Sequence, residues 1–111
     1  MPVTDAAVER ILYALAAVRP ITSKKMFGGI GIYGDGVFFA VIDNDRLYFK
    51  VDGESQADYE PYHAEQWIIE GDKPQPMPYR ELPAAVLAEP DLLGTLIETA
   101  ITVSQRKKRK S

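Results

Sequence analysis

The 111-residue sequence contains no cysteine and only one histidine, His63. Without cysteine the chain cannot form a disulfide, bind a metal through a thiolate or use a thiol as a nucleophile. A single histidine excludes a metal site built from several imidazoles. No apolar run approaches the roughly 20 residues that span a bilayer, and the first ten residues are too charged for a secretory signal. We expect a cytoplasmic protein that needs no metal or cofactor and does not enter a membrane.

Positive charge is scarce except at the C-terminal end. The net charge is -3, yet five of the 13 basic residues are consecutive at positions 106–110. Residues 1–105 therefore hold 8 basic and 16 acidic residues, a net charge of -8. Such a body repels a phosphate backbone, whereas the tail attracts one. The tail is either a solvated helix end or a weak nucleic-acid-binding segment formed by Arg106, Lys107, Lys108, Arg109 and Lys110.

The first half of the chain predicts one helix followed by a three-stranded meander. Apolar residues recur at helical spacing over residues 5–18, with Thr4 as a plausible N-cap and Pro20 beyond the end. Strands are expected at residues 25–33, 37–42 and 46–51, joined by glycine- and aspartate-rich turns. Every residue of 37–42 is apolar, which indicates a central strand that is covered on both faces.

The second half predicts a short helix, two more strands and a long helix. The short helix covers residues 54–59 and is broken by Pro61, and the strands cover 66–70 and 75–82. Prolines at every second position of the segment 74–78 remove backbone donors, which favours an edge position for the last strand. A helix over residues 91–104 follows Pro90. The fold class is therefore α+β, with an antiparallel sheet of about five strands packed by N- and C-terminal helices.

One stretch of the sequence resembles a known family. Residues 25–40 read KMFGGIGIYGDGVFFA and residues 47–52 read LYFKVD, followed by Lys73-Pro74, Met77, Tyr79, Leu82-Pro83 and the helix that begins at Pro90. These motifs are similar to the N-terminal domain of TfoX/Sxy proteins, bacterial regulators of natural competence, over about residues 8–103. Phe38 and Arg80 depart from the methionine and the aromatic residue that the family pattern leads us to expect.

The resemblance implies an α+β sheet domain without established catalytic residues. It also implies a protein partner that regulates transcription, since family members act with the cyclic-AMP receptor protein at promoters. Full-length members carry a second, helical domain. We expect this chain to be a stand-alone N-terminal-type domain over residues 1–105, followed by a disordered basic tail over 106–111.

The glycine-rich segment 28–31 does not match a phosphate-binding loop, because an apolar strand follows it in place of a helix. In a strand, Phe27, Gly29, Gly31 and Tyr33 share one face, which leaves bare backbone between two aromatic rings. This pattern indicates either close packing or a bulge, or else a groove for a ligand.

Other polar residues predict structural roles. Asp43, Asp45 and Asp52 are typical of turns, and His63 is expected in a loop. No acidic pair or Ser–His arrangement has the spacing of a catalytic set. Aromatic residues concentrate on the predicted strands, which favours core packing over a base-stacking platform.

These observations lead to one main hypothesis and two alternatives. We expect a non-enzymatic regulatory or adaptor domain that binds another protein. The first alternative is an accessory nucleic-acid-binding protein that uses the basic tail. The second is an enzyme or ligand-binding protein that uses the groove at Gly29 and Gly31.

Overall fold

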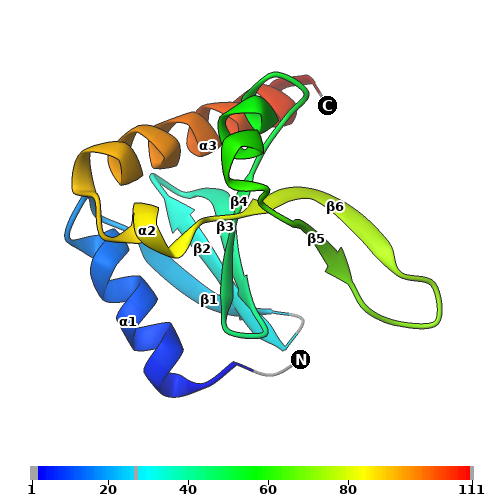
Figure 1. Cartoon of the computed structure of the whole chain (residues 1–111), viewed down its shortest axis with the longest axis horizontal. Coiled ribbons are helices and arrows are strands. Elements are labelled where there is room, and N and C mark those ends of the chain that lie inside the picture. Colours follow the sequence, from blue (N-terminus) through cyan, green and yellow to red (C-terminus); the bar gives the residue numbers. More distant parts are fainter. Residues whose placement is uncertain (1–2, 27, 111) are drawn as a thin grey trace.

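A computed structural model of the chain describes the backbone of residues 3–26 and 28–110, and side chains up to Arg106. The elements, in chain order, are α1 (Asp5–Ala16), β1 (Thr22–Met26), β2 (Gly29–Gly34), β3 (Val37–Asp43), β4 (Arg46–Lys50), the 3-10 helix η1 (Ser55–Tyr62), β5 (Gln66–Ile69), β6 (Gln75–Glu81), α2 (Ala84–Leu87) and α3 (Pro90–Lys110). The predicted α+β class and the helices at both ends of the domain are confirmed (Figure 1).

The strands form one antiparallel sheet in the order β1-β2-β3-β4-β6-β5. The sheet has six strands where the sequence predicts about five, because residues 25–33 do not form a single strand. Gly28 adopts a positive φ of 77° between β1 and β2, a conformation that glycine adopts without strain. The chain therefore turns back at this point, and Lys25 pairs with Ile30.

Strand β6 is not at an edge, contrary to the prediction from its prolines. It lies between β4 and β5, but β4 pairs only with residues 79–81, beyond the last proline of β6. The proline segment of β6 extends past the end of β4. The N–H groups that the prolines lack would therefore have had no partner on β4, and no hydrogen bond between these two strands is lost. The carbonyl of Pro78 still accepts a hydrogen bond from the Val51 amide at 2.9 Å.

The short helix also differs from the expected one. Residues 55–62 form a 3-10 helix that includes Pro61 and ends where His63 adopts a left-handed φ of 53°. Hydrogen bonds continue on both sides of the proline, for example from the His63 amide to the Glu60 carbonyl at 3.0 Å. His63, which the sequence placed in a loop, is therefore the residue that caps the C-terminal end of this helix.

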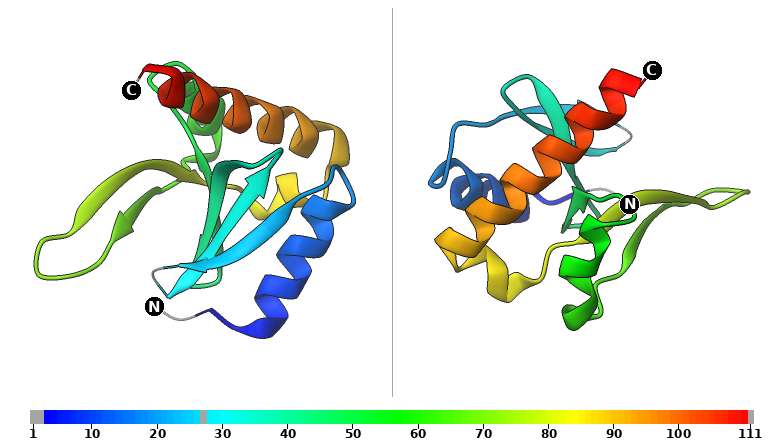
Figure 2. Two further views of the ribbon diagram at one scale, coloured as in Figure 1. Left: turned by 180° about the vertical axis from the view of Figure 1, so that it is seen from behind. Right: turned by 90° about the horizontal axis from the view of Figure 1, so that it is seen from above.

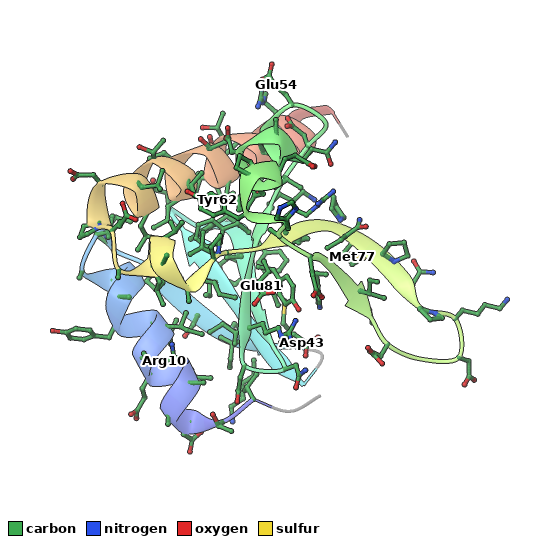
Figure 3. The ribbon with its side chains drawn as sticks, in the orientation of Figure 1. Arg10, Asp43, Glu54, Tyr62, Met77 and Glu81 are labelled. Atoms are coloured by element: carbon green, nitrogen blue, oxygen red, sulfur yellow. The ribbon has the colours of Figure 1, made fainter. Side chains whose placement is uncertain are left out.

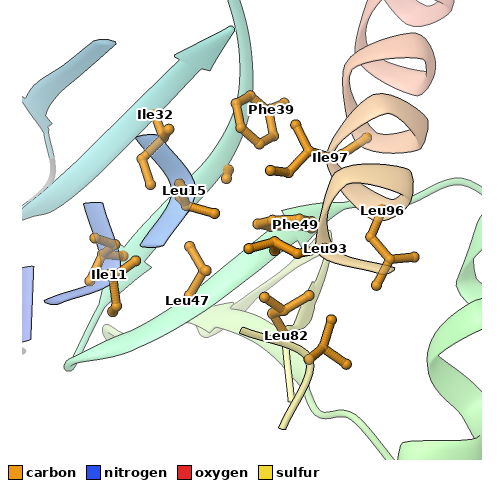
Figure 4. Packing of buried hydrophobic residues seen from close by; sticks show 14 of the residues in the cluster. Ile11, Leu15, Ile32, Phe39, Leu47, Phe49, Leu82, Leu93, Leu96 and Ile97 are labelled. Atoms are coloured by element: carbon orange, nitrogen blue, oxygen red, sulfur yellow. The ribbon is translucent and has the colours of Figure 1, made fainter. Parts of the chain in front are cut away.

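The main core lies between the sheet and the three α-helices. Leu15 of α1, Val86 of α2 and Ile97 of α3 are fully buried against strand residues, of which Phe39 and Phe49 meet edge to face at 5.5 Å (Figure 4). The pairing of β2 with β3 shifts register after Phe38, so that Phe39 has no opposite residue. This bulge places both Phe39 and Ala40 in the core on the helix side.

The ends of the chain and the second hairpin complete the arrangement. Strands β5 and β6 form a hairpin that extends away from α1 and α3 in the views of Figures 1 and 2. The backbone of residues 106–110 continues α3, and the degree of order in this tail stays a prediction. In the described part of the chain, no helix is both long and apolar enough to cross a membrane.

Candidate binding face of the sheet

A second apolar cluster lies on the side of the sheet that faces away from the α-helices. Its buried members are Val41, Tyr48, Trp67 and Tyr79, with Phe38, Ile69 and Met77 packed against them. All of these residues belong to strands. Val41 stands between Ala40 and Ile42, whose side chains enter the helix-side core, so strand alternation places this cluster on the opposite face. We call this side the helix-free face.

Strand register joins the aromatic rings of this face into a row. Tyr33 lies opposite Phe38, and their ring centroids are 5.4 Å apart. The row continues from Phe38 to Tyr79 at 6.1 Å, from Tyr79 to Trp67 at 5.3 Å, and from Trp67 to Tyr48 at 6.1 Å. Five rings thus connect β2 with β5. Offset and edge-on pairs at these distances stabilise a sheet beyond the area that they bury.

The row is buried at one end and accessible at the other. Tyr48, Trp67 and Tyr79 are between 4% and 8% exposed. Tyr33 and Phe38 are half-buried, as are the two methionines that border the row, Met26 on β1 and Met77 on β6. We call these four half-buried residues the exposed strip of the helix-free face: Met26, Tyr33, Phe38 and Met77.

Curvature of the sheet buries the end of the row at Trp67. The indole Nε1 of Trp67 donates a 2.9 Å hydrogen bond to Oδ2 of Asp43. Asp43 is the last residue of β3 (Figure 3). In the sheet order, β4 and β6 lie between β3 and β5, the strand that carries Trp67. The edge strand therefore bends back over the face, and the buried indole N–H is satisfied. Asp43, which the sequence predicts only as a turn residue, thus also accepts the hydrogen bond of the Trp67 indole.

Cations border the exposed strip. Lys24 is exposed on the helix-free face, opposite Gly31 in the β1–β2 pairing. The Nζ of Lys50 lies 5.1 Å from the centroid of the Tyr79 ring, within range of a cation–π interaction. Burial raises the pKa of Tyr79 to about 12, so its hydroxyl stays neutral beside this lysine. Arg46, also on this face, lies 3.6 Å from Glu81 and 3.5 Å from Glu65.

The predicted groove at the glycines is largely filled. A Cβ on Gly31 would lie 2.8 Å from Met26 Sδ and 3.1 Å from Phe38, so these side chains cover the bare backbone. A Cβ on Gly29 would lie 2.3 Å from the Ile42 carbonyl oxygen on β3. Tyr33 packs against Phe38 with ring centroids 5.4 Å apart, and Phe27 lies outside the described residues. This geometry supports the close-packing interpretation of Gly29 and Gly31.

A cleft of about 570 Å³ remains beside Gly28, between α1 and the β1–β2 turn. Its lining is mainly apolar, with Lys25 and Asp5 as its charged members. Met26, a member of the exposed strip, also lines this cleft, which extends from there to Val8 of α1.

The other polar residues singled out from the sequence have structural contacts. Asp45 accepts hydrogen bonds from the Thr4 amide at 2.7 Å and the Thr4 hydroxyl at 3.1 Å, next to the N-terminus of α1. Backbone hydrogen bonding from Ser55 holds the pKa of Asp52 below its ordinary value. Within the described ranges, no three acidic or histidine side chains are placed to hold a metal ion.

The basic tail lies apart from the helix-free face. Arg106, on α3, forms an ion pair with Asp52 at 3.3 Å. The side chains of Lys107, Lys108, Arg109 and Lys110 lie outside those that the structure describes.

Sequence reasoning missed the exposed strip as a unit. Met26 and Lys24 could not be assigned to this face while residues 25–33 were expected to form one strand. A signal for Lys50 was present, because Tyr48 and Lys50 alternate with the apolar residues of their strand and so must lie away from the helix-side core.

Comparison with known proteins agrees with the resemblance seen in the sequence. No curated protein matches the chain. Among protein families, the TfoX N-terminal domain matches residues 13–104, which is most of the sequence. The chain therefore belongs to the TfoX N-terminal domain family.

Proposed function

We propose that this chain is a non-enzymatic regulatory or adaptor domain that binds another protein through the helix-free face. The observation that carries the proposal is the exposed strip. An antiparallel sheet with one uncovered face usually presents polar residues there. Here the face presents two half-buried aromatic rings and two methionines in contact with a buried aromatic row. Aromatic residues and methionine are enriched at protein interfaces.

Family membership supports a more specific role for the domain. Members of the TfoX/Sxy family are regulators of natural competence, and the resemblance implies a transcription regulator as partner. We propose that this chain likewise contributes to regulation of competence or transcription through protein–protein contacts. The contact residues would lie on the folded body, because the exposed strip belongs to four strands of the sheet.

The proposal predicts that a protein is captured through the exposed strip. The immobilised chain is incubated with cytoplasmic extract of its source cells, with and without nuclease. We expect one protein to be retained in both cases, and Tyr33→Glu or Met77→Glu to reduce its recovery at least about tenfold, since truncating central aromatic contacts often costs 2 kcal/mol or more. Mass spectrometry identifies the retained protein and measures its amount.

A matched variant controls for the added charge. Tyr13→Glu introduces the same charge at an aromatic residue of α1 that is 80% exposed, and it should leave recovery unchanged. Thermal unfolding of each variant shows that the fold is retained. Equal loss in all three variants, or retention that disappears with nuclease, would contradict the proposal.

The basic tail supports a second candidate function, namely weak nucleic-acid binding. Helix α3 continues through Lys110, so the five cations of residues 106–110 follow one another on the last turns of a helix. Five phosphate contacts at most predict a salt slope of about -4 to -5 on duplex DNA. Deletion of residues 107–111 leaves one of these cations, and the slope should fall to about -1.

Fluorescence anisotropy with labelled duplex DNA at several salt concentrations measures this slope. The deletion leaves Arg106 and its ion pair with Asp52 in place, so stability should not change. If tight, sequence-selective DNA binding survived the deletion, the acidic body would have to carry a recognition surface, and the tail would not be the nucleic-acid-binding segment.

A further inference from the structure

We propose that the outer edge of β1 accepts an extended segment of another protein as an added antiparallel strand. The segment carries an apolar residue opposite Lys25 and an acidic residue opposite Lys24. This inference goes beyond the proposed function, because a strand can occupy the edge whether or not the exposed strip is occupied. It follows from three features of β1: the direction of its unpaired backbone groups, the cleft beside Lys25, and the charge of Lys24.

Strand β1 is an end strand with a regular and open edge. It pairs only with β2, through five consecutive residue pairs without a register shift. Residues 22–25 are exposed, and the strand contains no proline. Strand β5, at the other end of the sheet, has four residues and an irregular register with β6. Of the two edges, that of β1 is therefore the better suited to pair with a further strand.

The register of the sheet shows which backbone groups of β1 face outward. In a strand, the N–H and C=O of one residue point to the same side, and successive residues alternate. The Leu47 carbonyl accepts a 2.8 Å hydrogen bond from the Leu82 amide, so the backbone groups of Leu47 face β6. Those of its β3 partner Ile42 therefore face β2, and those of Ile30 on β2 face Ile42. Lys25, opposite Ile30, must direct its backbone groups away from the sheet.

The unpaired groups of this edge select an extended backbone as their partner. Ser23, two residues from Lys25, also directs its backbone groups outward. Among the described residues, neither forms a backbone hydrogen bond on this side. The edge thus presents two N–H and two C=O groups at the spacing of a strand. An extended segment supplies the complementary groups, whereas a helix uses its own internally. Antiparallel pairing is the more stable arrangement per residue.

The cleft beside β1 selects an apolar side chain. Lys25 is paired with Ile30, whose side chain enters the helix-side core, so Lys25 lies on the helix side of β1. A partner residue opposite Lys25 points to the same side. There the cleft of about 570 Å³ offers Val3, Val8 and Ile30 as apolar contacts. Its two charged lining residues, Lys25 and Asp5, have opposite signs, so the lining adds no net charge and favours an apolar residue.

Lys24 points to the helix-free face and selects an acidic residue. Its row of paired residues runs through Gly31, Val41 and Tyr48 and reaches an acid only at Glu81 on β6, four strands away. In the described part of the chain, Lys24 forms no ion pair. An acidic residue directly opposite Lys24 in the added strand would form a cross-strand ion pair, which stabilises antiparallel pairing.

The lysines disfavour a second copy of this chain as the occupant. Outward residues must pair with outward residues, so a two-fold axis that pairs more than one residue of β1 passes through Ser23, Lys24 or Lys25. An axis through either lysine places identical lysines directly opposite each other, which destabilises the pairing. An axis through Ser23 pairs only residues 22–24 of β1 with the copy.

The test measures amide hydrogen exchange by NMR on the folded, ¹⁵N-labelled chain. The probe is a synthetic heptapeptide in which glutamate and leucine alternate and both ends are blocked. At a saturating concentration, we expect the amides of Ser23 and Lys25 to exchange at least tenfold more slowly, because they become hydrogen-bonded to the peptide. The amide of Lys24, which faces β2, should keep its rate.

Two methylated peptides test the added ladder itself. The leucines share the helix side with Lys25, so their N–H groups face β1, whereas those of the glutamates face away. Methylation of the leucine nitrogens should therefore weaken binding at least tenfold. Methylation of the glutamate nitrogens should change the affinity less than about twofold, since these groups take no part in the pairing.

Variants of the chain test the edge from the other side. Ser23→Pro removes an outward N–H that takes no part in the β1–β2 ladder, and it should weaken binding at least tenfold, whereas Ser23→Thr keeps it. Lys24→Glu should make the peptide with lysine in place of glutamate the tighter binder. Lys73→Glu, at an exposed lysine between β5 and β6, should leave the preference unchanged. Thermal unfolding of each variant establishes that the sheet is intact.

The remaining outcomes decide against the proposal. Equal affinity of the two methylated peptides, unchanged exchange at Ser23 and Lys25, or a preference that Lys24→Glu does not alter would overturn it. Protection of both amides at high protein concentration without peptide would assign the edge to a second copy. Met77→Glu should lower recovery of the extract protein without changing peptide binding, so that the adaptor proposal and the strand addition fail separately.

Discussion

Replacing Phe49 by alanine should lower the free energy of unfolding by about 3–5 kcal/mol, the usual cost of truncating a buried phenylalanine. Phe49 is fully buried at the centre of the helix-side core, where its ring meets Phe39 edge to face at 5.5 Å. Since β4 pairs with β3 and β6 on its two sides, the backbone around Phe49 cannot easily collapse into the space. The loss of stability should therefore include most of the free energy of the cavity that the missing ring leaves, in addition to the lost burial of the ring itself. Urea denaturation followed by circular dichroism measures it.

Two further variants calibrate this result. Leu47→Ala, on the same strand and 5% exposed, should cost about 2–5 kcal/mol. Tyr13→Ala removes an aromatic ring that is 80% exposed on α1, and surface substitutions of this kind usually stay within about 0.5 kcal/mol. If Phe49→Ala cost no more than Tyr13→Ala, the helices could not be packed on this face of the sheet.

Periodic apolar segments of the sequence predict most of the fold correctly. The helical stripe at residues 5–18 corresponds to α1, and the apolar run at 37–42 lies in the central strand β3, of which residues 39–42 are buried and Val37 and Phe38 are half-buried. The second face, however, is not covered by a helix. Aromatic side chains of β4, β5 and β6 cover it, because the sheet curls enough for Trp67 to reach Asp43.

The errors arise where backbone pairing overrides local pattern. Strand β1 is exposed along most of its length and has no apolar alternation, so nothing in its residues distinguishes it from a loop. It forms because the positive φ of Gly28 turns the chain back onto β2. The prolines of β6 do indicate a strand edge without a hydrogen-bonded neighbour, but only in the part of β6 that extends past the end of β4. Neither outcome can be derived without knowing which strands are neighbours.

The candidate site shows the same limit. Tyr33 and the lysine of β4 could be placed on an outer face from alternation alone. Phe38 and Phe39 could not both be assigned, because the bulge opposite Tyr33 sends them to different clusters. A single extra residue in β3 thus decides which ring stabilises the core and which one is available to a partner.

Gly29→Ala should destabilise the protein more than Gly31→Ala, although the two glycines share one face of β2. The new Cβ at position 29 would lie 2.3 Å from the Ile42 carbonyl oxygen, and a paired backbone atom in the centre of the sheet cannot move away. At position 31 the nearest atom is Met26 Sδ at 2.8 Å, the end of a flexible side chain. We expect a cost of about 3 kcal/mol for Gly29→Ala and about 1 kcal/mol for Gly31→Ala, the upper and lower ends of the usual range for overpacking.

Gly53→Ala is the matched control, because a Cβ there meets no atom within 4 Å and its φ is not in the positive range. It should leave stability unchanged or raise it slightly by restricting the unfolded chain. Thermal and urea unfolding of the three variants give the ranking. Gly31→Val extends the comparison, since its added methyl groups must displace both Met26 and Phe38 and should cost about 1–3 kcal/mol. If Gly31→Val left the melting temperature unchanged, Met26 and Phe38 would not pack on this glycine, and a groove for a ligand would again be the better explanation of the glycine face.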